Sequence, residues 1–153
     1  MAVNPVPKGY HTITAQLAID GAEKAIEFYK NAFGAELVDH AKDPSGKKVW
    51  HASLRIGDSI FFVNDVFPDM GGSASHSSLW LYVSDCDALY RRATQAGAKG
   101  TQPPADMFWG DRMAHVTDPF GQRWAIATHI KDMTPDEQKK AAEAFAAAMK
   151  NKK

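Results

Sequence analysis

The chain has 153 residues, the length of one typical domain, and carries no formal net charge. Lys and Arg together number 18, as do Asp and Glu. One hydrophobic core is enough for such a chain, which buries roughly two-thirds of its unfolded surface. The neutral balance argues against nucleic acid or an anionic membrane as a partner, and no apolar run reaches the roughly 18 residues of a membrane span. We therefore expect one cytoplasmic domain over residues 1–153, without a signal peptide.

The cysteine content restricts the chemistry further. Cys86 is the only cysteine, so no internal disulfide and no site built on a pair of cysteines can form. No base adjoins Cys86 in the sequence, and we expect it to be structural.

The first half of the chain is predicted to contain a strand, a helix and three further strands. Residues 12–19 alternate between apolar and polar side chains, as in a half-buried strand. Apolar residues then recur at helical spacing over 21–33, with Asp20 placed to cap the start of the helix and Gly34 its end. Period-2 patterns predict the three strands at 36–40, 47–56 and 59–65.

The second half repeats this order after a stretch rich in Gly, Ser and Pro at 67–77, which favours a solvated linker. Residues 78–83 alternate like the first strand, a helix follows between Asp85 and Gly97, and 100–110 is predicted to be an insertion-tolerant loop. A final hairpin is predicted from strands at 111–117 and 122–129, joined by the turn of Asp118 to Gly121.

Three landmarks recur at nearly one spacing along the chain. The spacings are 65 residues from Asp20 to Asp85, 63 from Gly34 to Gly97 and 64 from Gly57 to Gly121. A shared offset of this kind indicates an internal duplication, so the two halves should fold as two similar modules.

The C-terminal residues differ from both modules. Thr134, Pro135 and Glu137 form a capping box with proline at the first helical position. The helix predicted at 135–150 carries an apolar stripe, which we expect to dock on the domain or on a partner subunit. The stripe consists of Ala141, Phe145, Ala148 and Met149.

Two segments resemble the vicinal oxygen chelate superfamily, which includes glyoxalases, bleomycin-resistance proteins and extradiol dioxygenases. They are residues 20–33, after the first strand, and 118–124, before the last one. The segments 33–36, 51–58 and 109–112 are similar to the phosphonate-operon-type subgroup. The likeness covers about residues 10–130.

This resemblance implies an α+β fold in which two βαβββ modules form a glyoxalase-like half-barrel pocket. The expected parts are module 1 at about 10–66, the linker at 67–77, module 2 at about 78–130 and the C-terminal helix at about 135–150.

The resemblance also implies positions for a divalent metal, on the inward face of the first and last strands of each module. Carried over, these positions fall at Thr14 (or Thr12), Phe61, Ser78 and Ala125. None of these residues is a usual ligand for zinc, nickel, manganese or iron. We therefore predict no metal and no other cofactor, although a metal at a displaced site stays open.

Two histidines are candidates for catalysis. His51 and Arg55 share one face of their strand, and His115 lies in the related strand of module 2. If the two imidazoles meet across the pseudo-twofold, they could act as acid and base. The alternative is a pair of hydrogen-bonded histidines without chemistry. We expect the other histidines to lie at the surface: His11, His40, His76 and His129.

A group of aromatic residues suggests an apolar binding cleft. They are Trp50, Phe61, Trp80, Tyr82, Phe108 and Trp109. Packing in the core or at a dimer interface explains them equally well. Arg55, Asp111 and Arg112 could supply polar contacts, the arginines to a ligand carboxylate or phosphate. Alternatively, Asp111 and Arg112 only pair with each other to fix a loop. Asp118 is expected to hold its hairpin turn.

These features support three hypotheses. The first is a metal-free protein that binds an apolar or aromatic small molecule. The second is an enzyme, either a lyase, an isomerase or a dioxygenase-like member, with a displaced metal site or a pair of His51 and His115. The third is an interaction module without a ligand. In each case we expect a homodimer, because the C-terminal helix and exposed strand edges favour association.

Overall fold

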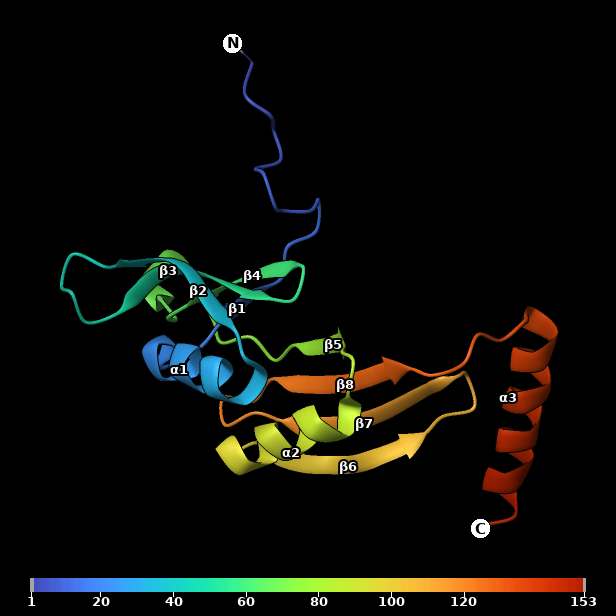
Figure 1. The fold of residues 1–153 in the computed structure, drawn as a ribbon. Helices are drawn as coiled ribbons and strands as arrows, with labels where there is room; N and C mark the ends of the chain where they lie inside the picture. The colour runs from blue at the N-terminus through green and yellow to red at the C-terminus, as the bar shows by residue number, and fades with distance from the viewer. Residues whose placement is uncertain (1, 153) are drawn as a thin grey trace.

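The computed structural model describes residues 2–152 and confirms an α+β fold with two βαβββ modules and a C-terminal helix (Figure 1). Module 1 contains β1 (Gln16–Ala18), α1 (Ala22–Phe33), β2 (Glu36–Lys42), β3 (Val49–Ile56) and β4 (Ser59–Asn64). A short 3-10 turn, η1 (Pro68–Met70), precedes module 2, which contains β5 (Ser78–Tyr82), α2 (Cys86–Ala96), β6 (Lys99–Asp106), β7 (Asp111–Thr117) and β8 (Arg123–His129). The chain ends with α3 (Pro135–Lys150).

Each module forms its own four-stranded sheet with the same topology. The first sheet has the order β1-β4-β3-β2 and the second the order β5-β8-β7-β6. In both, the first strand is an edge strand that pairs in parallel with the last, and the other pairs are antiparallel. The repeated strand order supports the predicted duplication. Among the described residues, no helix is both long and apolar enough to cross a membrane.

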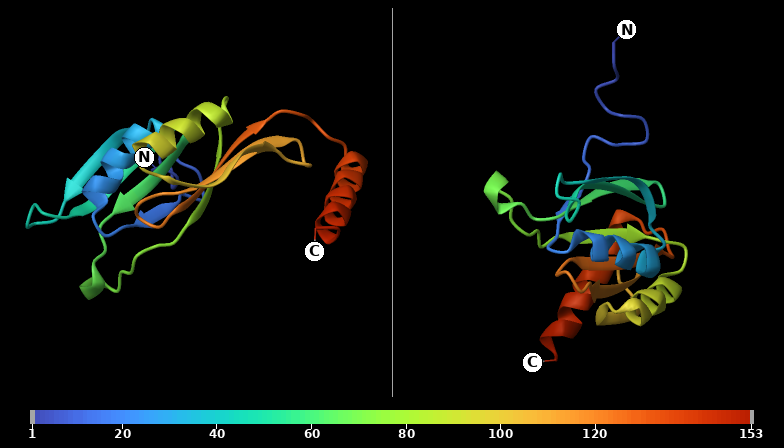
Figure 2. Two further views of the ribbon diagram at one scale, coloured as in Figure 1. Left: turned by 90° about the horizontal axis from the view of Figure 1, so that it is seen from below. Right: turned by 90° about the vertical axis from the view of Figure 1, so that its left-hand side faces the viewer.

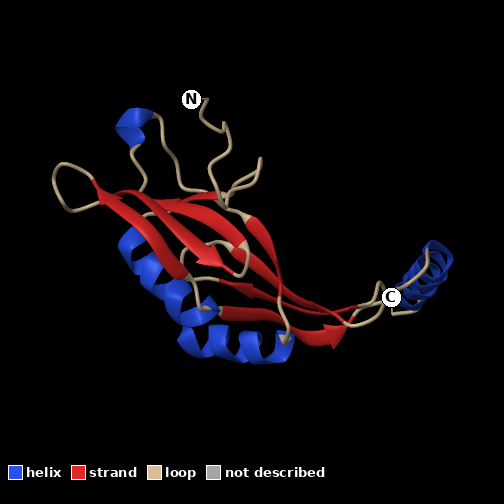
Figure 3. Cartoon of the chain, turned by 45° about the horizontal axis from the view of Figure 1, so that its top comes forward, coloured by secondary structure: helices blue, strands red, loops and turns tan. Residues whose placement is uncertain are grey.

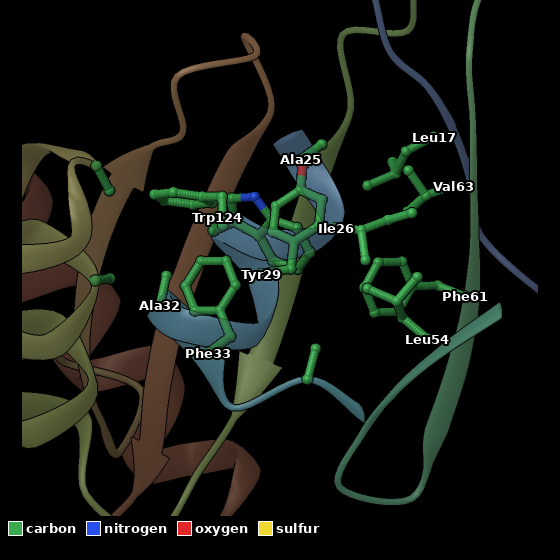
Figure 4. Close-up of a cluster of buried hydrophobic side chains, with 14 of the residues drawn as sticks. Leu17, Ala25, Ile26, Tyr29, Ala32, Phe33, Leu54, Phe61, Val63 and Trp124 are labelled. Atoms are coloured by element: carbon green, nitrogen blue, oxygen red, sulfur yellow. The ribbon is translucent and has the colours of Figure 1, made fainter. Parts of the chain in front are cut away.

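One hydrophobic core joins the two modules. Tyr29 and Phe33 on α1 pack against Phe61 of the first sheet and Trp124 of the second (Figure 4). The ring centroids of Phe33 and Trp124 are 4.7 Å apart. Because each sheet turns its helix-side face toward this core, the opposite face, here called the outer face, looks away from it (Figures 1 and 3).

The carboxylate of Asp118 connects the modules through four hydrogen bonds. Its Oδ2 accepts from the Tyr29 hydroxyl at 2.6 Å and from the Trp124 indole at 2.9 Å. Its Oδ1 accepts from the backbone N–H groups of Phe120 and Gln122, both at 2.9 Å. Asp118 therefore holds its hairpin turn, as predicted, and also ties α1 to module 2. Burial and the neighbouring carboxylate raise the pKa of Tyr29.

The start of α1 is capped by a different residue from the one predicted. Asp65, at the end of the first sheet, accepts from the backbone N–H groups of Gly21 and Ala22 at 3.0 and 3.1 Å. Its other oxygen accepts from Val49 N at 2.7 Å. The prediction of Asp20 as the cap was wrong, because Gly21 adopts a left-handed conformation at the N-cap and a residue distant in sequence supplies the carboxylate.

Two further predictions about elements need correction. The first strand covers only residues 16–18, rather than 12–19. Residues 99–106 form β6, although 100–110 was predicted to be a loop. Pro103 and Pro104 cannot donate to a sheet, but β6 is an edge strand with two register shifts, where proline is tolerated.

The linker is held against both modules. Gln122, which is fully buried, donates to Ser75 O and accepts from Ser77 N, both at 2.7 Å. Ser75 N in turn donates to Ala18 O of β1 at 2.9 Å. The end of the linker is therefore an ordered connection between β1 and β5.

Helix α3 stands apart from both sheets (Figures 1 and 2). Its predicted capping box is present, with Thr134 and Glu137 bonded reciprocally. Phe145 contacts Phe108 at a centroid distance of 5.0 Å, while half of the Phe145 side chain stays exposed. The apolar stripe is thus only partly covered by this chain.

Replacing Tyr29 by phenylalanine tests the connection between the modules. We expect the Tyr29→Phe variant to lose about 2 kcal/mol of unfolding free energy, because a buried carboxylate loses a donor. The matched control is Tyr90→Phe, since the described residues provide no hydrogen-bond partner for that hydroxyl. Urea denaturation measures both. Equal losses in the two variants would contradict the role of the Asp118 bond.

Candidate functional site

A groove of about 870 Å³ lies between β5 of module 2 and, in module 1, the residues just before β1 and the turn from β3 to β4. Its floor is the aromatic part of the shared core, made by Phe33, Phe61 and Trp124. Its walls carry mostly aliphatic side chains. On the module 1 side they include Ile13, Ala15, Ile56 and Ile60, and on the module 2 side Leu79, Leu81 and Val83. We call this cavity the intermodule groove.

Three of the predicted ligand-binding residues line the intermodule groove. Phe61 lies in its floor and is 7% exposed, whereas Trp80 and Tyr82 lie on β5 and are 45% and 65% exposed. From Trp80 the aromatic surface continues onto the outer face of the second sheet, where Trp109 lies 6.4 Å from it and Phe108 packs against Trp109 at 5.0 Å. Four of the six predicted aromatic residues therefore lie in one cluster, whereas Phe61 lies in the core and Trp50 lies beside Phe67.

The two predicted arginines are in ion pairs. Arg112 makes two bonds to Asp87, at 2.6 and 2.9 Å, and one to Asp106 at 2.9 Å. The suggested pair of Arg112 with Asp111 does not form. Arg55 lies 3.6 Å from Glu36 at the exposed end of the first sheet. Neither arginine lines the intermodule groove.

The two predicted catalytic histidines are not brought together within the chain. His51 contacts Phe62, Ser53 and Asp39 on the outer face of the first sheet. His115 lies on the outer face of the second sheet, where its Nδ1 is 3.2 Å from Gln102 Oε1. Burial, together with the charge of Arg123, lowers the pKa of His115.

His51 also lacks the geometry of a proton relay. Its Nε2 faces both Ser53 Oγ at 3.1 Å and Asp39 Oδ1 at 3.4 Å. In a Ser-His-Asp triad the hydroxyl and the carboxylate contact opposite nitrogens of the ring. The cluster is therefore a hydrogen-bonded patch rather than an activated nucleophile.

Strand register shows which residues of the two sheets face outward near the positions carried over for a metal ligand. On the outer faces, Gln16 is paired with Phe62, and Trp80 with Ala125. Phe61, the position carried over from sequence, faces the core instead, because it pairs with buried Leu54.

The residues at these outward positions do not fit a divalent metal ion. They provide two aromatic rings, a methyl group and one amide, and that amide, of Gln16, is already bonded to Asn64 at 2.8 Å. Carboxylates and imidazoles are the donors that such a metal prefers. Within residues 2–152, no three His, Cys, Asp or Glu side chains are grouped to hold one.

The buried carboxylate of Asp111, which the sequence suggested as a polar contact or as a partner of Arg112, lies at the far end of the aromatic cluster. Asp111 is 2% exposed and accepts from the Tyr82 hydroxyl, the Trp109 indole and His129. Burial disfavours its charged form, but the hydrogen bonds from His129, Tyr82 and Trp109 prevail and lower the pKa of Asp111. Asp111 thus fixes the orientation of two aromatic rings of the cluster.

His129 holds the segment before α3 against this carboxylate. Its Nδ1 lies 2.8 Å from Asp111 Oδ1, and its Nε2 lies 2.8 Å from Asp132 Oδ1. Both carboxylates accept, so both ring nitrogens must donate, and this requires the charged imidazolium. Hydrogen bonds to Asp132 and Asp111 raise the pKa of His129. The prediction that His129 is a plain surface residue missed this role.

The raised pKa of His129 predicts a pH-dependent contribution to stability. The contribution is complete below the unfolded-state pKa of about 6.5 and disappears as the pH rises through the higher folded-state value. The difference in melting temperature between the wild type and His129→Gln should therefore shrink above neutral pH. In Asp132→Asn, which lacks the larger cause of the raised pKa, the loss should begin at lower pH. A difference that is constant from pH 5 to pH 9 would contradict this assignment.

Comparison with known proteins identifies relatives over most of the chain. The sequence profile of the Glyoxalase/Bleomycin resistance protein/Dioxygenase superfamily matches residues 11–126. An uncharacterized protein of Mycobacterium bovis is 35% identical over 146 residues, which cover 90% of this chain and 93% of the relative. The anthracycline biosynthesis protein DnrV of Streptomyces peucetius is 31% identical over 111 residues, covering 72% of this chain but only 38% of DnrV.

Solved structures show the same fold. TioX from Micromonospora sp. ML1 aligns with a TM-score of 0.63 at 28% identity, covering 81% of this chain and all of TioX. The Arabidopsis thaliana gene product At5g48480 aligns with a TM-score of 0.62 at 28% identity, covering 77% of this chain and 98% of that protein. On the profile match and these relatives, the chain belongs to the Glyoxalase/Bleomycin resistance protein/Dioxygenase superfamily.

Proposed function

We propose that this protein binds a planar, largely apolar small molecule in the intermodule groove, without a metal ion. The observation that carries the proposal is the aromatic floor of the groove, where Phe33, Phe61 and Trp124 from both modules meet beneath aliphatic walls. Flat apolar surface of this kind favours stacking of a planar ring system.

The size and lining of the groove support a small molecule as the occupant. Its volume of about 870 Å³ lies within the range of about 300–1,000 Å³ found for ligand pockets. Few polar side chains line it, and they are His11, Asp58, Ser59 and Ser84. A mostly apolar ligand with few polar substituents would match this distribution.

Two further observations support the proposal. Of the positions at which the family resemblance implies metal ligands, Phe61 and Ala125 carry apolar side chains and Thr14 and Ser78 carry hydroxyl groups, none of which is a usual donor for a divalent metal. One relative is named for the biosynthesis of anthracyclines, and a planar aromatic ligand for this chain is in keeping with that name.

Fluorescence titration with 1-aminoanthracene, a planar apolar probe, tests the groove. We expect Trp80→Ala to weaken binding about tenfold, equivalent to about 1.4 kcal/mol, because the probe loses one aromatic wall. Trp50→Ala is the matched control: Trp50 is 46% exposed against 45% for Trp80, but it lies beside Phe67 outside the groove.

The same titration tests the absence of a metal. Dialysis against EDTA should change neither the affinity nor the melting temperature. Equal affinities for both tryptophan variants would refute the groove as the site. A chelator effect on both quantities would instead point to a displaced metal and to an enzyme.

We also propose that two copies of the chain associate. The edge strands β1 and β5 are each paired on one side only. The apolar stripe of α3 leaves Phe145 and Met149 about half exposed. A partner copy would cover this surface, as closed symmetric assemblies commonly do.

Sedimentation velocity at micromolar concentration measures the association. The wild type should sediment as a dimer, and Phe145→Glu should shift it toward the monomer, because a charge is introduced into the stripe. Lys139→Glu, on the exposed start of the same helix, is the control. A wild-type monomer would refute the proposal.

A further inference from the structure

In the N-terminal segment, residues 2–15, the side chain of Tyr10 lies on the outer face of the first sheet. Between residues 2 and 13, only Val6 and Tyr10 are partly buried. Within the described part of the chain, the first backbone hydrogen bond from this segment to the sheet joins Phe62 N to Ala15 O. The position of the segment before Ala15 therefore depends on what the Tyr10 ring contacts.

The Tyr10 side chain makes two kinds of contact: its ring packs on Phe62, and its hydroxyl bonds to Ser53. The ring centroid is 5.8 Å from that of Phe62, on β4. The hydroxyl donates to Ser53 Oγ on β3 at 3.3 Å. Ser53 is fully buried, and its oxygen also lies 3.1 Å from His51 Nε2, which is 3.4 Å from Asp39. These groups form a chain of donors and acceptors that ends at the phenol.

This arrangement selects for a hydroxyl attached directly to an aromatic ring. Ser53 and Phe62 are direct neighbours across two adjacent strands, which lie roughly 4.8 Å apart. A molecule whose ring covers Phe62 can reach Ser53 Oγ only with a polar atom at the ring's edge. The His51 ring, whose centroid is 4.8 Å from that of Phe62, lies beside the position of such a ring. The matching pair in module 2 is His115 and Ala125, where a methyl group replaces the aromatic platform.

We propose that the place held by Tyr10 is a binding site for a phenolic ring, which a hydroxylated aromatic ligand occupies by displacing Tyr10. The phenolic ring of the ligand would then make the two interactions that Tyr10 gives up, the stacking on Phe62 and the hydrogen bond to Ser53. Tyr10 competes as a tethered group, and short tethers give effective concentrations in the millimolar range. A natural ligand must therefore add contacts elsewhere.

The intermodule groove can supply those contacts. His11 and Ile13, which follow Tyr10 in the chain, line the rim of the groove, and Ile60 on its wall is two residues from Phe62. A ligand with several fused rings could place its hydroxylated ring on Phe62 and the remainder in the groove. Only this use of the groove rests on the proposed function. Together, the phenol site and the groove narrow the ligand class to hydroxylated polycyclic aromatic molecules.

Nuclear magnetic resonance titration with 4-methylphenol, the detached side chain of tyrosine, tests the phenol site. In Tyr10→Ala we expect 4-methylphenol to bind about fivefold more tightly than toluene and to shift the resonances of Ser53, His51 and Phe62. The double variant Tyr10→Ala/Ser53→Ala should bind both probes equally. The wild type and Tyr10→Phe should bind 4-methylphenol about fivefold more weakly than Tyr10→Ala, because a tethered ring still competes.

Three outcomes would overturn the inference: equal affinity of Tyr10→Ala for the two probes, shifts confined to other regions, or no binding. Tyr10 lies at the surface of the fold, and circular dichroism of each variant checks that the fold is kept. The 1-aminoanthracene titration separates this inference from the proposed function. If that probe binds in the groove while 4-methylphenol fails, only the phenol site is wrong. If 4-methylphenol behaves as expected and 1-aminoanthracene fails, the groove is wrong and the phenol site stands.

Discussion

The buried carboxylate of Asp118 is the interaction on which the arrangement of the two modules depends. A charge taken out of water is tolerated only when its oxygens are fully hydrogen-bonded, and here two backbone and two side-chain donors meet that requirement. The Tyr29 hydroxyl comes from α1 in module 1, so satisfying the carboxylate fixes α1 against the hairpin of module 2. That placement brings Phe33 and Trp124 together, and with Phe61 they become both the centre of the core and the floor of the groove.

Because both helix-side faces are used by the shared core, ligands are left with the groove between the modules and the two outer faces. These surfaces differ in chemistry. The first sheet presents a polar cluster around Ser53 and His51, partly covered by Tyr10. The second presents an aromatic surface around Trp80 and Trp109, oriented by buried Asp111 and closed at its end by the His129 imidazolium. The outer faces of the two modules thus differ in chemistry although the fold is duplicated. Their outward residues differ, whereas the core positions of both modules are apolar.

Much of the fold could be predicted because its signals are local. The cap residues Asp85 and Thr134 act within three residues of their partners, and the structure shows both caps. Periodicity placed the helices and most strands for the same reason. Prediction failed where a distant group replaces a local one: Asp65 caps α1 in place of Asp20, and pairing with β7 makes a strand of a segment containing two prolines. Within the candidate site, the sequence suggested Trp80, Tyr82, Trp109 and Asp111, whereas it did not suggest His129.

The sequence by itself determined the duplicated βαβββ plan, the aromatic content of the site and the lack of carboxylate or imidazole at the expected metal positions. Alternation along a strand also assigns residues to one face or the other, and it could have put His129 on the same face as Ala125 and Ala127. Only the tertiary structure decided which residues stand opposite one another, because register depends on turns and on pairing between strands. Register placed His129 beside Asp111, turned Phe61 into the core and set Phe62 outward beneath Tyr10. The packing of α1 against both sheets turns their outer faces away from the shared core. This packing, and not the register, keeps His51 apart from His115.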